Sequence, residues 1–126
     1  MILLWILFTY YEARYNGNLI NNGYWINHNH QTWRRIGAAI PCFILEYVIF
    51  QNIWLSVALI PLMATSFWLI FDFVINYTRK LGSLYIGHTS IIDKYFRKTF
   101  NNPKLIMILV KILLLSLSVM FYGRNF

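Results

Sequence analysis

The sequence predicts an all-α integral membrane protein with about three transmembrane helices, and three observations support this fold class. Residues 53–77 form a long apolar stretch in which Asp72 is the only charge. Hydrophobic residues make up 59% of the chain and charged residues only 12%, about half the charged share of an average water-soluble domain. Aromatic side chains gather at the ends of the apolar runs, as they do at membrane interfaces. About 20 apolar helical residues cross a hydrocarbon core of roughly 30 Å, so residues 53–77 are predicted to span it.

The chain of 126 residues has room for a single membrane domain. Residues 1–14 predict a short N-terminal apolar helix. Its roughly 11 apolar residues reach only about 17 Å, so whether this helix spans the membrane stays open. Residues 15–31 are polar and aromatic without a period, and the Asn-Gly pairs at 16–17 and 22–23 are turn signals. We therefore expect a polar loop over residues 15–31.

Residues 32–50 predict the next helix, with Thr32 as its N-cap. Only Gln51 and Asn52 separate it from residues 53–77, so the two helices are expected to form a tight hairpin. One long bent helix is the alternative. A patch of small residues lets another helix approach closely and is predicted to serve helix packing. This patch consists of Gly37, Ala38 and Ala39.

Residues 88–101 predict an amphipathic helix that lies in the membrane interface. Ser90 and Asp93 match a capping box at its start, and its apolar and charged side chains separate onto opposite halves of a helical wheel. A helix covering a water-soluble core is the alternative. Its cations are expected to contact lipid headgroups, which we expect to be anionic. These cations are Lys94, Arg97 and Lys98, together with Lys104 just beyond the helix.

Residues 103–122 predict the last helix, in which Asn102 is the cap and Pro103 holds the first position. Lys111 is its only charge. Because side chains lean toward the N-terminal end of a helix, Lys111 is expected to reach back toward the interface near Lys104.

Basic residues set the predicted orientation. Six of the eleven Lys and Arg residues lie between Arg79 and Lys104, and Arg34 and Arg35 are expected on the same side. Under the positive-inside rule this side is cytoplasmic, or the matrix in an organelle. We expect a bacterial inner membrane or a mitochondrial inner membrane. The same pattern accounts for the net charge of +7, so no nucleic-acid partner is expected.

Three ionisable residues, Glu46, Asp72 and Lys111, are predicted to lie within the membrane. Such residues are costly there and are functional candidates by default. Glu46 has no basic partner in the hairpin. It serves a proton or cation pathway, or it is a neutral side chain hydrogen-bonded to Ser56 or a backbone carbonyl, or it lies near enough to the outer interface to reach water. Asp72 falls level with Arg34 and Arg35 across the hairpin and is predicted to form an ion pair with them.

No catalytic constellation is readable in the sequence, and we expect no cofactor and no metal. His28 and His30 are the only candidates for a metal site. They supply two ligands, whereas zinc needs four, or three plus water. His88 or Glu12 would add a ligand only if the fold brought them together.

One segment of the chain resembles a known group of proteins. It contains Trp68-x-x-Phe71-Asp72, then a basic stretch, then Tyr85-x-Gly87-x-Thr-Ser-x-x-Asp93-Lys. Over residues 67–98 this pattern is similar to that of small, uncharacterised integral membrane proteins encoded by tailed bacteriophages and related mobile elements. The resemblance implies no known activity. It implies that Asp72, Gly87 and Asp93 set the shape of the chain.

The sequence therefore predicts a small, non-enzymatic membrane protein that packs into a larger membrane assembly. Its expected partners are lipids and either other membrane protein subunits or further copies of itself. Three alternatives stay open. The first is a subunit of an organellar respiratory complex, the second is a proton-conducting, ion-conducting or holin-like component that uses Glu46, and the third is an intramembrane enzyme with a His-rich metal site.

Overall fold

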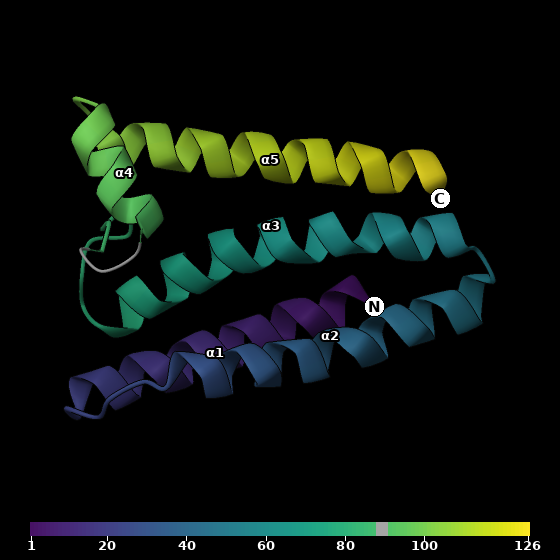
Figure 1. Ribbon diagram of the computed structural model, residues 1–126, viewed down its shortest axis with the longest axis horizontal. Helices are drawn as coiled ribbons and strands as arrows, with labels where there is room; N and C mark the ends of the chain where they lie inside the picture. The colour runs from purple at the N-terminus through teal and green to yellow at the C-terminus, as the bar shows by residue number, and fades with distance from the viewer. Residues whose placement is uncertain (88–90) are drawn as a thin grey trace.

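The computed structural model describes residues 1–87 and 91–126, and every regular element in this part of the chain is an α-helix. Four long helices lie side by side, and a short one crosses the bundle at one end (Figure 1). The predicted all-α fold class is therefore confirmed for the described residues. The helices are α1 (Ile2–Asn21), α2 (His28–Phe50), α3 (Ile53–Thr78), α4 (Ile91–Thr99) and α5 (Pro103–Asn125).

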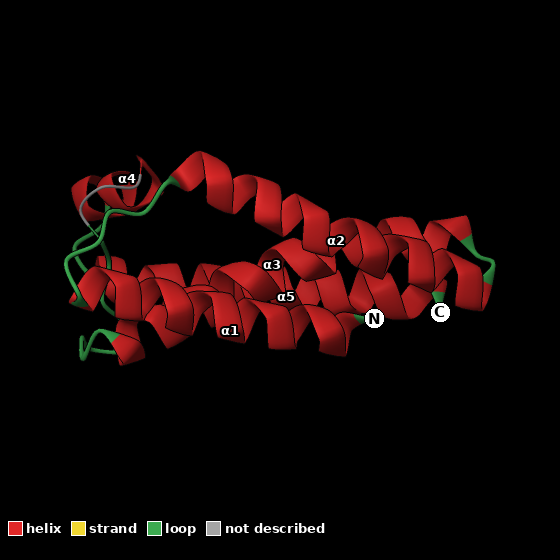
Figure 2. Ribbon diagram, turned by 90° about the horizontal axis from the view of Figure 1, so that it is seen from below, coloured by secondary structure: helices red, strands yellow, loops and turns green. Residues whose placement is uncertain are grey.

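Helix α3 is the centre of the bundle, because it contacts α1, α2 and α5. Helices α1 and α3 run in the same direction, and α2 and α5 run opposite to them (Figures 1 and 2). All Lys and Arg residues except Arg124 lie in the half of the bundle where α1 and α3 end, or in the segments beyond it. We call this half the basic end. The hairpin turn and both chain ends lie in the opposite half.

The hairpin predicted for residues 32–50 and 53–77 is confirmed, and the single bent helix is wrong. Gln51 has a left-handed backbone conformation (φ 51°) that ends α2. The side chain of Asn52 accepts hydrogen bonds from the backbone N–H groups of Trp54 and Leu55, at 3.0 and 3.2 Å, and so caps α3.

The loop expected over residues 15–31 is wrong for most of its length. Helix α1 continues to Asn21 and α2 begins at His28, so only residues 22–27 separate the two helices. The second Asn-Gly pair does mark a turn, because Gly23 follows α1 with φ 78°. The N-terminal helix is therefore longer than the predicted 1–14.

The first Asn-Gly pair has a different role from the one expected. Gly17 lies inside α1 and is buried against α3. A Cβ atom at this position would lie 2.8 Å from both Cβ and Cγ2 of Thr78. Glycine is thus required for the close approach of α1 to α3. At the same crossing, the side-chain amide of Asn21 donates to the carbonyl of Thr78 (3.0 Å).

The start of α2 is set by Asn27, whose side chain accepts a hydrogen bond from the N–H of His30 (3.2 Å). The predicted N-cap, Thr32, lies one turn inside the helix, where its hydroxyl donates to the carbonyl of His28 (2.9 Å). The prediction of Thr32 as the cap is wrong because α2 begins at His28, in the polar segment before the apolar run.

The last two helices are close to their predicted ranges. Helix α4 is shorter than the expected 88–101, and the predicted capping residue Ser90 lies outside the described residues. Helix α5 extends beyond the expected 103–122 to Asn125. The predicted cap of α5 is present, since the side chain of Asn102 accepts a hydrogen bond from the N–H of Leu105 (3.4 Å).

The buried side chains include charged as well as apolar residues, which is unusual for a water-soluble bundle. Large apolar side chains are exposed on every helix, whereas Glu12 and Glu46 are among the largest fully buried side chains. Helices α3 and α5 are long and apolar enough to cross a membrane. In the most apolar 18-residue stretch of each helix, only 39% and 17% of the residues are buried, respectively. Helix α2, expected as a third span, does not reach this criterion because polar residues fill its first turns.

Replacing Gly17 by alanine is expected to destabilise the bundle by about 1–3 kcal/mol, because the new methyl group has no space against Thr78. The matched control is Gly37→Ala in α2, where a Cβ atom meets nothing within 4 Å. That change is expected to stabilise by up to about 1 kcal/mol through helix propensity. Thermal unfolding of the detergent-solubilised variants, followed by circular dichroism, measures both. Equal effects of the two substitutions would contradict the α1–α3 contact.

Candidate functional site

The buried charges of the bundle gather on two sides of α3, and the first set involves Asp72. Its carboxylate forms a hydrogen-bonded ion pair with Lys111 of α5. The Lys111 ammonium also lies 4.9 Å from the centre of the Trp68 ring, close enough for a cation–π contact. Lys111 is only 6% exposed. The structure thus pairs Asp72 with α5, not with Arg34 or Arg35 as predicted.

This correction has a physical cause. The prediction considered depth within the α2–α3 hairpin alone, where Arg34 and Arg35 are the cations nearest to Asp72. Depth does not determine which face of a helix a side chain occupies. Asp72 lies on the face of α3 that packs against α5, one turn from Trp68, and so Lys111 turns inward rather than reaching back toward Lys104.

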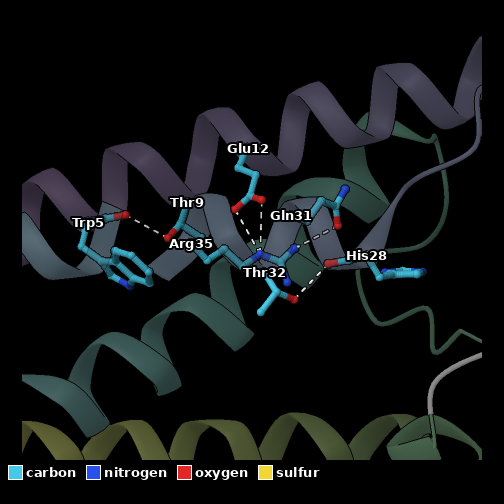
Figure 3. A network of polar contacts seen from close by, with 7 residues as sticks. All are labelled: Trp5, Thr9, Glu12, His28, Gln31, Thr32 and Arg35. Carbon is cyan, nitrogen blue, oxygen red and sulfur yellow. Dashed lines mark hydrogen bonds and ion pairs between the residues drawn. The ribbon is translucent and has the colours of Figure 1, made fainter. Parts of the chain in front are cut away.

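The second set of buried charges lies on the α1–α2 side of α3 (Figure 3). Nε of Arg35 donates to both carboxylate oxygens of Glu12, at 3.2 and 3.3 Å, and Nη2 donates to the side-chain oxygen of Gln31 (3.3 Å). The guanidinium lies 4.6 and 4.9 Å from the centres of the Phe67 and Phe71 rings of α3. Glu12 is 2% exposed, so Arg35 neutralises a carboxylate that has no access to water.

Sequence reasoning missed Glu12 because it ended the first helix at Arg14 and so placed Glu12 near a solvated end. A signal was present. Trp5, Thr9, Glu12 and Asn16 recur at helical spacing, and all four are buried on one face of α1. A polar stripe at that spacing within an apolar helix indicates an interior face, not a loop.

The two ion pairs lie at a similar depth. Counting 1.5 Å per residue, Glu12 and Asp72 lie about 14 and 9 Å from the ends of α1 and α3. Arg35 and Lys111 lie about 11 and 12 Å from the starts of α2 and α5. Each long helix therefore contributes one charge, Arg35 and Asp72 line the same cavity, and the four charges cancel. We call this set the charge layer.

Arg34, the neighbour of Arg35, points elsewhere. Its guanidinium lies 5.5 Å from the centre of the Tyr15 ring of α1, and the residue is exposed. The two adjacent arginines therefore have different roles, since Arg35 enters the charge layer and Arg34 packs on the surface of α1. Arg34 is not a partner of Asp72.

Glu46 lies in the half of the bundle opposite the basic end and is 1% exposed. Oε1 of Glu46 accepts a hydrogen bond from the hydroxyl of Tyr122 in α5, and Oε2 lies 3.9 Å from the Met1 α-ammonium. Ser56, the hydrogen-bond partner weighed from the sequence, donates instead to the carbonyl of Asn52 (3.2 Å). Both neighbours of this carboxylate come from outside the hairpin.

An apolar cluster separates Glu46 from the charge layer. Its buried members pack together, and the Trp5 indole N–H donates to the Met63 carbonyl (2.8 Å). The buried hydroxyls of Thr9 and Ser66 lie beside the cluster, and each donates to a backbone carbonyl of its own helix. The cluster consists of Trp5, Cys42, Leu59, Leu62 and Met63.

The predicted small-residue patch is only partly used within the chain. Ala38 and Ala39 are half-buried and pack against the apolar cluster. Gly37 is exposed, and a Cβ atom there would meet nothing within 4 Å. Among the described residues, Gly37 therefore does not serve the packing of one helix against another.

The predicted headgroup-binding cations divide into two kinds. Lys94, Lys98 and Lys104 are exposed at the basic end. Arg97 is engaged with its own chain, because its guanidinium donates to the backbone carbonyls of Ile86 and Gly87. These hydrogen bonds hold α4 against residues 86–87.

Asp93 and Gly87 make a second contact in the same place. A Cβ atom on Gly87 would lie 2.7 Å from Oδ2 of Asp93, so this contact needs glycine. Burial raises the pKa of the Asp93 carboxyl group above its ordinary value, and the negative charge of Asp72 raises this pKa further. The charges of Lys111 and Arg97 and a hydrogen bond from the Gly87 backbone oppose the rise.

The histidines do not assemble a metal site within the described residues, where no three His, Cys, Asp or Glu side chains are grouped. His28 and His30 lie in the first turn of α2, and both are exposed. His88, the third histidine, lies outside the described residues. The chemistry that the described arrangement supports is charge neutralisation between helices.

Comparison of the chain with protein-family models, with curated proteins and with solved structures found no match. The resemblance of residues 67–98 to phage-encoded membrane proteins therefore stays a prediction. Two parts of that pattern have structural roles here, because Trp68 and Asp72 hold Lys111, and Gly87 accommodates Asp93.

Replacing Asp72 by asparagine is expected to destabilise the protein by about 3 kcal/mol, because it leaves the Lys111 ammonium buried without a counter-charge. We take the low end of the range for buried pairs because Asp72 is 37% exposed. The double variant Asp72→Asn/Lys111→Met is expected to recover much of this loss. Chemical unfolding in detergent gives the coupling energy of the cycle.

The control cycle pairs Asp72→Asn with Arg34→Gln. The effects of these two substitutions are expected to add within about 0.5 kcal/mol, as for residues that do not interact. Strong coupling of Asp72 to Arg34 and none to Lys111 would contradict the ion pair described above.

Proposed function

We propose that this chain is a small integral membrane protein whose four long helices lie in the bilayer, and that it works without catalysis by packing into a larger membrane assembly. The observation that carries the membrane location is the inverted surface of the bundle. Apolar side chains face outward on α1, α2, α3 and α5, and the charges of Glu12, Glu46 and Lys111 are buried. In water, such a surface would aggregate. In a bilayer, lipid covers the apolar surface, and the inward-facing charges are paired.

The proposed membrane segments include α1 and α2, which are less apolar than α3 and α5. Their charges favour this placement because Glu12 and Arg35 neutralise each other inside the bundle. A 20-residue helix is about 30 Å long, close to the thickness of a hydrocarbon core. We thus revise the expected three spans to four membrane-embedded helices.

The distribution of cations supports one orientation. The basic end would face the cytoplasm, or the matrix of a mitochondrion. Helix α4 would then lie in the interface, where its exposed Lys94 and Lys98 meet anionic lipid headgroups. Ile91 and Tyr95 of α4, which are also exposed, would enter the headgroup boundary. Both a bacterial and a mitochondrial inner membrane fit this arrangement.

The outer face of α2 supports the assembly role. Ile36, Ile40 and Ile44 form an exposed apolar stripe along this helix. Gly37 lies beside this stripe, and a Cβ atom there would meet nothing within 4 Å among the described residues. Exposed glycine on an apolar helix face is the feature that allows a second transmembrane helix to approach closely. A partner subunit or a second copy of the chain would pack there, whether the assembly is a respiratory complex or one of another kind.

Substitution of Gly37 by leucine is expected to reduce this assembly at least several-fold without destabilising the isolated chain, because the side chain has open space in the monomer. The tagged chain, extracted from its native membrane in a mild detergent, is expected to migrate above the monomer mass. The variant is expected to migrate mainly as the monomer, with a thermal stability equal to or slightly above that of the wild-type chain, because leucine has a higher helix propensity than glycine. A wild-type chain that is extracted as a monomer with no partner would contradict the assembly role.

Ion conduction through Glu46 is the second candidate function. One observation favours it, since Oε2 of this buried side chain has no hydrogen-bond partner among the described residues. The apolar cluster between Glu46 and the charge layer argues against it, because the buried hydroxyls beside the cluster, on Thr9 and Ser66, donate to the backbone of their own helices.

We therefore expect liposomes containing the purified chain to show the same proton flux as protein-free liposomes. Glu46→Gln is expected to leave this flux unchanged, as measured with a pH-sensitive dye inside the vesicles. A flux well above background that Glu46→Gln abolishes would replace the assembly role by conduction.

A further inference from the structure

A groove runs between α1 and α3 at the basic end, and the charged residues described along it are all cations. Its volume is about 940 Å³. Arg14 and Lys80 lie in its wall with the side chains of Tyr10, Asn18 and Tyr77. None of the described residues that line it is acidic. In this respect it differs from the cavity beside the charge layer, where Asp72 and Asp93 lie among the lining residues.

The groove changes character along its length. Helices α1 and α3 are parallel, so Asn18 and Lys80 both lie near the end of the bundle (Figure 1). Phe73, which also lines the groove, is about 10 Å deeper along α3. The exposed Leu7 of α1 continues the apolar path beyond it. Lys80 thus lies at the end of the groove, whereas Arg14 lies about 10 Å before the end of α1, at nearly the depth of Phe73.

The side chain of Arg14 packs against Tyr10. Its Nη1 donates to the hydroxyl of Tyr10 (3.3 Å), and its guanidinium lies 5.9 Å from the centre of the same ring. No carboxylate pairs with it among the described residues, in contrast to Arg35. Its position is therefore constrained while its charge is not neutralised.

Lys80 is held in an unfavourable backbone conformation. Its φ is 57°, in the left-handed region where glycine is favoured, and it follows directly after the end of α3. A non-glycine residue in this conformation costs free energy, which the surrounding structure must offset. Glycine would end the helix with less strain but would remove one of the two charges of the groove.

We propose that this groove binds one anionic phospholipid, with the phosphate between Arg14 and Lys80 and an acyl chain against Phe73. The inference rests on the membrane location proposed above. It adds a defined site on α1 and α3, separate from the cations of α4. The lipid phosphate supplies the charge that Arg14 and Lys80 lack, and the groove supplies an apolar wall that a free phosphate ion would not use.

The test is native mass spectrometry of the detergent-purified chain titrated with phosphatidylglycerol. The wild-type chain is expected to retain one lipid, and phosphatidylcholine, which has no net charge, is expected to bind at least tenfold more weakly. Arg14→Gln and Lys80→Gln are each expected to reduce the affinity for phosphatidylglycerol about fivefold. Arg124→Gln, which removes an exposed cation in the opposite half of the bundle, is the matched control and is expected to leave the affinity unchanged.

Lys80→Gly separates binding from folding. It is expected to raise the thermal stability of the chain, because glycine relieves the left-handed conformation, and to lower the lipid affinity as far as Lys80→Gln does. An unchanged affinity in Lys80→Gly would overturn the site, as would equal losses in Lys80→Gln and Arg124→Gln. Displacement of the lipid by inorganic phosphate at equal concentration would overturn the lipid as the ligand.

Failure of the membrane location is recognised separately. If washing native membranes at alkaline pH releases the chain, the proposed function fails, and this site fails with it. If the chain stays in the membrane but binds both lipids equally, only the site fails.

Discussion

Neutralisation of buried charge on both sides of α3 is the interaction on which this bundle depends. On one side Arg35 and Glu12 join α2 to α1 while the guanidinium packs on Phe67 and Phe71. On the other side Lys111 and Asp72 join α5 to α3. An isolated charge is costly in an apolar surrounding, and removing one member of such a pair leaves that cost uncompensated. The pairs therefore specify which face of each long helix points inward.

The rest of the structure follows from this constraint. With the charges inside and paired, the outer faces of the helices are free to be apolar. Cations outside the two ion pairs, such as Arg14, Lys80 and Lys98, gather at the basic end. The apolar cluster closes the middle of the bundle, so Glu46 has a local role with Tyr122 and no connection to the charge layer.

The sequence was sufficient for the parts of the fold that rest on long apolar runs. The sequence predicted helices α3 and α5 and the short turn at Gln51. Long apolar runs mark both helices, and few polar residues interrupt these runs. It did not predict the second half of α1. Asn16 and Gly17 together have the local sequence of a turn. In the structure both are buried inside α1, and Gly17 contacts α3. The packing of α3, which the local sequence does not reveal, determines their conformation. The same limit applies to Asp72, since its partner depends on which helix packs on that face.

Paramagnetic relaxation of methyl signals in lipid nanodiscs tests the central claim most directly. A nitroxide attached near the end of a lipid acyl chain is predicted to broaden the signals of Ile44 and Leu113, which are exposed on the outer faces of α2 and α5. A water-soluble gadolinium chelate is predicted to leave both signals sharp. If the chelate broadens them and the nitroxide does not, the apolar surface faces water, and the account of paired charges inside a membrane bundle is wrong.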